Sequence, residues 1–192
     1  MAKRAGATRI GYPCPMALAT VRPAVPSDVA EIARIQADTW AAAYSAFVPE
    51  QAVEQLRGPE AQAAWTSAIE GGQGHVLLAD EGAHVVGFCA AAALPAREDE
   101  PLTWGEIGAL LVEPRWGRRG HGGRLLAAAA QALREDGARY GLAWVPEPDE
   151  ASRRFYARAG WEPDGAVRGL DTGTGEMREI RITGSLDLAL TS

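Results

Sequence analysis

Residues 105–126, "GEIGALLVEPRWGRRGHGGRLL", contain the pattern that decides the fold. An apolar run ends at Pro114, glycines follow at 117, 120, 122 and 123, and a second apolar run begins at Leu125. Glycine loses more backbone freedom on folding than any other residue, so such a cluster indicates a tight turn or a close approach of the backbone to another group. The stretch therefore predicts a strand over 104–114, a glycine-rich turn, and a helix from about Gly122 to Glu135.

A glycine-rich turn that leads into a helix can bind an anion. The N–H groups of the first helical turn are unpaired and carry the positive end of the helix dipole. A phosphate can approach them where no Cβ intervenes. The residues of the predicted site are Arg118, Arg119, Gly120, Gly122, Gly123 and Arg124. A diphosphate-bearing cofactor fits this pattern, and a turn that needs glycine only for its geometry stays open as the alternative.

The turn differs from both common nucleotide-binding motifs. A Walker loop requires a Lys before Ser or Thr, and residues 105–126 contain no Lys. A dinucleotide-binding G-x-G-x-x-G/A motif requires a small third residue, and Leu125 stands at that position in "GHGGRL". The sequence therefore disfavours an ATP or NAD site here.

Upstream of this stretch, the pattern predicts a strand, helices and a hairpin. A short strand over Thr20–Pro23 precedes a helix for which Asp28 and Glu31 have capping-box spacing. Two short helices follow, divided at Gly58–Pro59. Strands over 75–80 and 84–94 are joined by a turn at Glu81–Gly82.

Downstream, a strand over 138–147 leads to a helix over 150–160 that Asp149 caps and Gly160 ends. Two last strands flank a turn at Thr172–Gly175. Adjacent hairpins pair antiparallel and helical crossovers pair parallel. We therefore expect one α/β domain over 19–190, with a mixed central sheet of six to seven strands flanked by about four helices. Residues 1–18 are expected to be a disordered tail, and Met16 is an alternative start.

Composition limits the function classes. The 192 residues carry a net charge of −6, which argues against a broad nucleic-acid surface. No apolar run approaches the roughly 20 residues of a membrane span. Cys14 and Cys89 suggest no disulfide framework, and the scattered histidines offer no metal-ligand spacing. We expect a cytoplasmic protein that binds no metal, nucleic acid or membrane.

Two motifs carry a resemblance to a known family. Residues 105–126 resemble motif A of the GNAT family, the GCN5-related N-acetyltransferases, through Val112, Pro114, Gly120, Gly122 and the Leu125–Leu126 pair. Gly117 stands where the family usually has Arg or Gln. "DEASRRFYARAGW", residues 149–161, resembles motif B. There Asp149 replaces the usual Asn, Ser152 replaces Ala, and Trp161 replaces Phe.

The resemblance implies a GNAT-like fold and acetyl-CoA as cofactor. It places the diphosphate in the motif A turn and pairs the pantetheine with the backbone of the strand before it. The cofactor-binding residues that we expect are Leu110, Leu111, Val112, Arg118, Arg119, Gly120, His121, Gly122, Gly123, Asp149 and Tyr156.

Acetyl transfer from a thioester to an amine needs a neutral amine and a proton for the departing thiolate. The resemblance implies Tyr156 as the acid; a tyrosine that only packs by its ring is the alternative. Glu106 is our candidate base, directly or through a water, and a solvated or Arg-paired edge residue is its alternative. Strand alternation predicts that Glu106 shares one side with Leu110 and Val112. Glu113 is expected to be a surface charge.

The acceptor site is less defined by the sequence. Trp40 and Tyr44 lie on an early helix that covers the acceptor in the family, and Asp171 could attract a cationic amine. Core packing and a solvated turn are the respective alternatives. We expect an N-acetyltransferase that acts on a primary amine of a small molecule or protein by direct attack in a ternary complex. A non-catalytic CoA-binding sensor and a homodimer stay open.

Overall fold

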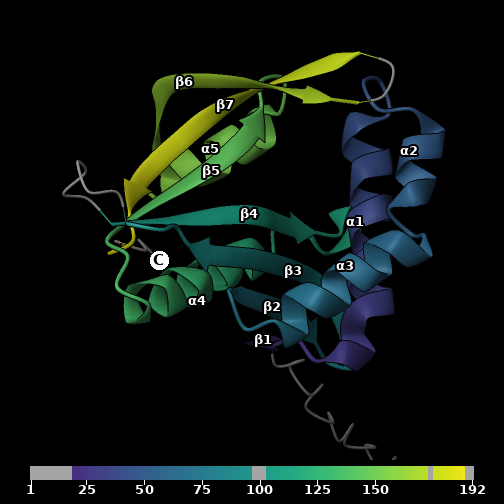
Figure 1. Ribbon diagram of the computed structural model, residues 1–192, viewed down its shortest axis with the longest axis horizontal. Helices are drawn as coiled ribbons and strands as arrows, with labels where there is room; N and C mark the ends of the chain where they lie inside the picture. The colour runs from purple at the N-terminus through teal and green to yellow at the C-terminus, as the bar shows by residue number, and fades with distance from the viewer. Residues whose placement is uncertain (1–18, 97–102, 173–174, 189–192) are drawn as a thin grey trace, which may run out of the picture.

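The computed structural model describes residues 19–96, 103–172 and 175–188, and every structural statement below concerns these residues. They form one seven-stranded mixed sheet in the order β1-β2-β3-β4-β5-β7-β6 (Figure 1). The strands are β1 (Ala19–Pro23), β2 (His75–Glu81), β3 (His84–Ala93), β4 (Trp104–Val112), β5 (Tyr140–Pro146), β6 (Glu162–Asp171) and β7 (Glu176–Ser185). The α-helices are α1 (Val29–Tyr44), α2 (Glu50–Gln55), α3 (Pro59–Glu70), α4 (His121–Glu135) and α5 (Glu150–Arg158).

The predicted α/β class and mixed sheet are confirmed, with five described helices in place of about four. The short segments on either side of Gly58 are separate helices, because Pro59 at the first position of α3 starts a new helix. The predicted tail at 1–18 lies outside the described residues. Among the helices of the described part, none is long and apolar enough to cross a membrane.

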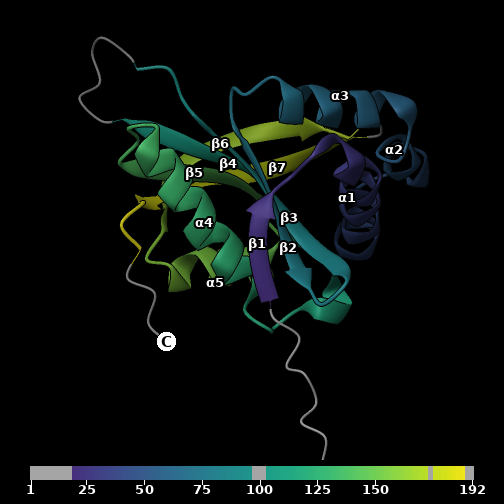
Figure 2. The same cartoon turned by 90° about the horizontal axis from the view of Figure 1, so that it is seen from below.

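Helices cover the two faces of the sheet in separate groups (Figures 1 and 2). Ile32 and Ile35 of α1, with Trp65 of α3, pack on Leu78 and Phe88 of the central strands. On the other face, α4 and α5 share one core cluster with β2–β5 and β7. The buried residues of α4 recur at helical spacing: Leu125, Leu126, Ala129, Ala130 and Leu133.

The sheet opens between β4 and β5. These strands pair in parallel only from Trp104–Tyr140 to Ile107–Ala143, and they then diverge toward their C-terminal ends (Figure 1). The ladder between β3 and β4 is irregular at the same point, because Ala90 pairs with Ala109 and Ala91 with Ile107. Gly108 is therefore the extra residue of a β-bulge. Beyond the bulge, the edge of β4 that faces β5 has no partner strand among the described residues.

The bulge corrects our prediction for Glu106. Ile107, Leu110 and Val112 all contact the core cluster beneath α4 and α5, whereas Ala109 and Leu111 contact the cluster beneath α1 and α3. One extra residue in a strand shifts the alternation by one, so side chains before and after it exchange faces. Glu106 consequently lies on the face opposite Leu110 and Val112, not on the same one.

Two helix starts differ in how they are capped. The predicted Asp28–Glu31 capping box does not form: the Asp28 carboxylate accepts hydrogen bonds from Arg22 (2.7 and 3.0 Å) and from the backbone N–H of Val25 (2.8 Å). The predicted cap of α5 is present, since Asp149 accepts a 2.9 Å hydrogen bond from the N–H of Ser152. Helix α5 ends before Gly160, whose φ is +80°.

Trp161 fills a space that two glycines create. Gly141 of β5 pairs with Gly184 of β7, and a Cβ at either position would lie 2.2 Å from the indole ring. Trp161 is 1% exposed, and its Nε1 donates a 3.0 Å hydrogen bond to the carbonyl of Ser185. The glycine pair explains why the chain tolerates Trp at a position where the resemblance leads us to expect Phe.

Candidate active site

A cleft of about 730 Å³ opens between the free part of β4, the glycine-rich turn and α5. Its lining residues include Leu110, Val112, Trp116, Arg118, Gly120, His121, Gly122, Gly123, Arg154, Phe155, Tyr156 and Arg158. Sequence motifs A and B thus meet at one site. The cleft adjoins the place where β4 separates from β5.

The turn holds its backbone in an unusual conformation. Gly120, the residue before α4, is left-handed with φ +83°, and Arg118 has φ +61°, a region that side chains disfavour. The first hydrogen bond of α4 runs from Arg124 N to the carbonyl of Gly120 (3.0 Å), so the N–H groups before it have no helical partner. Left-handed residues beside right-handed ones turn successive N–H groups toward one point, which makes an anion-binding concavity.

Three arginines surround this concavity. Arg154 pairs with Glu150 at 2.9 Å, whereas no described carboxylate pairs with Arg118 or Arg158. Arg118 is among the residues that we predicted, whereas Arg154 and Arg158 of α5 are not. Their spacing, i and i+4 on one helix face, was the available signal.

Not every predicted cofactor residue reaches the cleft with its side chain. Leu111 contacts the core beneath α1 and α3, so only its backbone can face the opening. Arg119 is directed to Glu81. Asp149 caps α5 and also accepts a 2.7 Å hydrogen bond from the Tyr44 hydroxyl. A Cβ at Gly122 would lie 3.2 Å from Phe155, so this glycine also allows α4 and α5 to approach each other.

Tyr156 lines the cleft from α5. Its ring stacks on Trp161 at 5.4 Å and meets Phe155 edge-on at 5.1 Å. The residue is 5% exposed, and no described group hydrogen-bonds to its hydroxyl. Burial raises the pKa of Tyr156 well above its ordinary value, with smaller contributions from Cys89, Tyr44 and Asp149. The hydroxyl therefore stays protonated and available as a donor.

Glu106 borders a second hollow, of about 760 Å³, on the opposite face of the sheet. The end of α3, the start of β2 and the alanines of β3 line this hollow, and Gly108 lies at its border. Among its lining residues, the one carboxylate is that of Glu106. Glu106 and Tyr156 thus line separate hollows on opposite faces of the sheet.

Trp40, Tyr44 and Asp171 come together near a third hollow. Trp40 and Asp171 line this cavity of about 560 Å³ between α1–α3 and the end of β6. The Tyr44 ring meets that of Trp40 edge-on at 5.5 Å. Burial, then the hydrogen bond to Asp149, raises the pKa of Tyr44.

Glu113 is not the surface charge that we expected. Its residue is 4% exposed, and its carboxylate accepts hydrogen bonds of 2.5 Å from Arg34 of α1 and from Arg115. The long-range partner Arg34 makes this burial tolerable, because buried carboxylates require paired charges. Glu113 fixes the end of β4 against α1.

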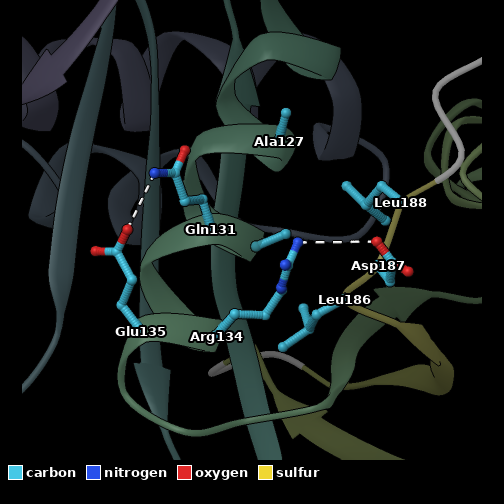
Figure 3. A pocket seen from close by; sticks show the side chains of 8 residues that line it. Ala127, Gln131, Arg134, Glu135, Leu186, Asp187 and Leu188 are labelled. Carbon is cyan, nitrogen blue, oxygen red and sulfur yellow. Dashed lines mark hydrogen bonds and ion pairs between the residues drawn. The ribbon is translucent and has the colours of Figure 1, made fainter.

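A further hollow, shown in Figure 3, lies between α4 and the residues after β7. Arg134 faces Asp187 across it at 3.8 Å, and Gln131 donates to Glu135 at 3.0 Å. None of the predicted site residues lines it.

Comparison with known proteins decides the family. A family model described as "Acetyltransferase (GNAT) family" matches residues 33–161. The chain belongs to the GNAT family. This GNAT chain is similar to the "Uncharacterized N-acetyltransferase YuaI" of Bacillus subtilis (strain 168), with 30% identity over 130 residues, 68% of this chain and 73% of that protein. The predicted membership is confirmed.

Solved structures agree on the fold. The PaiA N-acetyltransferase of Thermoplasma acidophilum, in complex with coenzyme A, matches with a TM-score of 0.68 and 16% identity, covering 85% of this chain and 98% of that one. YncA of Salmonella typhimurium, a putative acetyltransferase with its cofactor acetyl-CoA, matches with a TM-score of 0.67 and 19% identity, covering 90% and 96%.

Membership of the acetyltransferase family implies acetyl-CoA as the acyl donor. The residues of the cleft fit this molecule. Free helix N–H groups and the unpaired Arg118 and Arg158 suit a diphosphate. The open edge of β4 beyond Ile107 suits the amides of pantetheine, which can pair with it as an added strand would.

Proposed function

We propose that this GNAT acetyltransferase transfers the acetyl group of acetyl-CoA to a primary amine of a small molecule, by direct attack within a ternary complex. One observation carries the proposal. Tyr156 lines the cleft on one face of the sheet, and Glu106 borders the hollow on the other face, one residue before β4 stops pairing with β5, which supports their assignment as the acid and the base on the two sides of one reacting carbonyl.

On the cofactor side, the turn before α4 binds the diphosphate through N–H groups and Arg118, with Arg158 nearby. The backbone of Leu110–Val112 pairs with pantetheine along the open edge of β4. Together these contacts direct the thioester toward Gly108, where β4 no longer pairs with β5. Holding both reactants in one geometry supplies much of the rate enhancement.

On the acceptor side, Glu106 removes a proton from the ammonium form of the amine, directly or through a water. This step matters because an alkylamine with a pKa near 10.4 is mostly protonated at neutral pH. The amine nitrogen then forms a bond to the carbonyl carbon as the carbon–sulfur bond breaks. Tyr156 donates its phenolic proton to the leaving sulfur and regains one from solvent. The nitrogen releases its second proton to solvent as the neutral amide forms, and Glu106 passes its proton to solvent. The ammonium thus loses two protons, the thiol gains one, and one proton is released overall.

The Glu106 hollow favours an amine with a compact apolar body. Its walls are mostly small or apolar side chains such as Val76, Leu94 and the alanines of β3, with a single carboxylate at Glu106. A cationic amine can pair with that carboxylate while its apolar part packs on the alanines. The Trp40 and Asp171 cavity is a second contact region for a longer acceptor. The predicted homodimer and cytoplasmic location stay predictions.

The test is a panel of amines with acetyl-CoA, read by thiol release. The panel compares short alkylamines and arylalkylamines with polyamines, free amino acids and peptides that carry a free N-terminus or a lysine. We expect turnover of compact amines with one apolar substituent. Thiol release with peptides alone would replace the small-molecule acceptor by a protein, and none with any amine would reject the proposal.

Glu106→Gln tests the assigned base. The variant keeps the shape of the side chain and removes its proton-accepting charge, so we expect turnover to fall by about 10²–10⁴ at neutral pH. The loss should shrink as the pH approaches the amine pKa, because the amine then deprotonates without help. Glu135→Gln, at the far end of α4, is the matched control and should retain wild-type turnover.

A further inference from the structure

Glu81, the last residue of β2, is hydrogen-bonded to two residues at the end of the glycine-rich turn. Its two carboxylate oxygens accept hydrogen bonds from Arg119 Nη1 (2.8 Å) and from His121 Nε2 (2.7 Å). The His121 side chain is 1% exposed. Its other nitrogen, Nδ1, is buried without a partner in the described residues, so Glu81 is the polar anchor of this imidazole.

Arg119 is fixed on three sides. Besides its bond to Glu81, its guanidinium lies over the Trp116 ring at 4.8 Å. Its carbonyl accepts a 3.0 Å hydrogen bond from Arg124 Nη1. The side chains of Arg119 and His121 are therefore held toward β2, and Arg118, Gly120 and His121 line the cleft.

This anchoring accounts for the backbone of Arg118. A non-glycine residue with φ +61° is strained and persists only where its surroundings determine it. Arg119, which follows Arg118, is hydrogen-bonded to Glu81, and so is His121, the first residue of α4. Glu81 therefore holds the turn in the shape that directs its N–H groups into the cleft.

The charge of Glu81 makes its role distinguishable. Partial desolvation raises the pKa of Glu81, but the hydrogen bonds from His121 and Arg119 together outweigh it and lower this pKa. Glu81 is therefore ionised at neutral pH. An anionic side chain beside an anion site opposes binding by charge alone. Removing the Glu81 carboxylate should strengthen CoA binding if its main effect is charge repulsion. It should weaken CoA binding if its main effect is to hold the turn in place.

We propose that Glu81 is a positioning residue for acetyl-CoA, which acts through Arg119 and His121 to preorganise the turn that binds the diphosphate. The inference rests on the proposed place of the diphosphate in the cleft. Glu81 itself contacts neither the cofactor nor the acceptor, because it lies behind the turn.

The experiment measures CoA affinity by calorimetry for wild type, Glu81→Gln and Glu81→Ala at one salt concentration. We expect Glu81→Ala to weaken CoA at least tenfold. Glu81→Gln keeps one acceptor and the same shape, so it should fold and weaken CoA by a smaller factor. In steady state, the KM for acetyl-CoA should rise while kcat at saturation stays near wild type. Unchanged or tighter CoA binding in Glu81→Gln and Glu81→Ala would overturn the proposal.

Two controls separate the ways to fail. Glu135→Gln removes the same charge from the far end of α4 and should leave CoA affinity unchanged. Arg118→Ala tests the cleft itself and should weaken CoA. If Arg118→Ala weakens CoA binding and the Glu81 variants do not, the cleft is supported as the CoA site and the positioning role of Glu81 is rejected. If Arg118→Ala does not change CoA affinity either, the proposed position of the diphosphate in the cleft is rejected as well.

Discussion

Tyr44 and Tyr156, two buried tyrosines, differ in what their hydroxyls contact. Tyr44 donates to Asp149 at 2.7 Å, whereas the Tyr156 hydroxyl has no partner among the described residues and lines the cleft. Burial raises the pKa of both phenols, so both remain protonated at neutral pH. Of these two phenols, Tyr156 is therefore the one that we propose as the proton donor to the leaving sulfur.

Tyr156→Phe tests this difference. The variant keeps the ring that stacks on Trp161 and removes the phenolic proton. We expect turnover to fall by about 10²–10⁴, the usual span for general acid catalysis. CoA affinity should barely change, because the thioester needs the proton only in the transition state.

Tyr44→Phe is the control. It removes a hydrogen bond to a charged group, so we expect a loss of roughly 1.5–3 kcal/mol in the free energy of unfolding, with turnover of the folded protein near normal. If Tyr156→Phe behaves like Tyr44→Phe, with lower stability and near-normal turnover, then Tyr156 is a packing residue and water or substrate protonates the sulfur.

Strand β4 illustrates the element scale. Its first part pairs with β5, and its second part is free on that side beyond Ile107. The single extra residue at Gly108 exchanges the two faces of the strand, so Glu106 and Leu110 face opposite sides. Strand β5, in contrast, pairs with β7 along its whole length, and Trp161 packs over the glycine pair of these two strands.

Gly184→Ala should destabilise the packing of Trp161 on β5 and β7. The added Cβ would lie 2.2 Å from the Trp161 ring, and the strand backbone leaves the fully buried indole little room. Overpacking of this kind costs about 1–3 kcal/mol. For a chain of this size each kcal/mol lowers the melting temperature by roughly 2–4 °C, which thermal unfolding followed by circular dichroism can measure.

Trp161→Phe provides the double-mutant cycle for that prediction. The smaller ring should relieve the clash, so the combined loss in Trp161→Phe with Gly184→Ala should be smaller than the sum of the single losses. Additive losses would show that the indole is not what excludes a side chain from position 184.

The whole molecule carries a net charge of −6, and some of its carboxylates are paired with arginines of other helices or strands. The hydrogen bond from Arg22, which joins β1 to the start of α1, lowers the pKa of Asp28. Because the folded pKa lies below the unfolded one, the unfolded chain takes up protons first as the pH falls. The stability that this carboxylate contributes is thus present at neutral pH and is lost in acid.

We therefore expect the melting temperature to be nearly constant from pH 8 to about 5 and to fall below the ordinary carboxyl pKa of about 4. Asp28→Asn should melt lower at neutral pH and should lose less between pH 5 and pH 3 than wild type. Parallel melting curves for the two proteins across this range would contradict the assignment to Asp28.

Ligand binding should stabilise the molecule as a whole. A ligand at a hundred times its dissociation constant adds about 2.7 kcal/mol to the free energy of unfolding, which corresponds to a rise of roughly 5–10 °C for a chain of this length. CoA and acetyl-CoA should both produce this rise in thermal melts. ATP and NAD should produce much less, and equal shifts with them would contradict the assigned selectivity of the cleft.

The sequence by itself determined the order of the elements and the local chemistry of the turn. Pro114 and the glycines at 117–123 mark where β4 ends and α4 begins, and Asp149 and Gly160 delimit α5. These signals are local: a cap, a proline or a glycine acts within a few residues. The two motifs at their spacing were enough for the family.

The tertiary structure alone decided which residues face each other. Sequence alternation placed Glu106 with Leu110, but the bulge at Gly108 depends on how β3 and β4 align. A glycine within a strand is compatible with a bulge but does not by itself fix one there. Glu81 and His121 lie 40 positions apart and meet only because β2 and α4 pack together. Glu113 is buried by Arg34, 79 positions away. Register and long-range charge pairing arise from contacts between distant segments, so local propensities in the sequence cannot specify them.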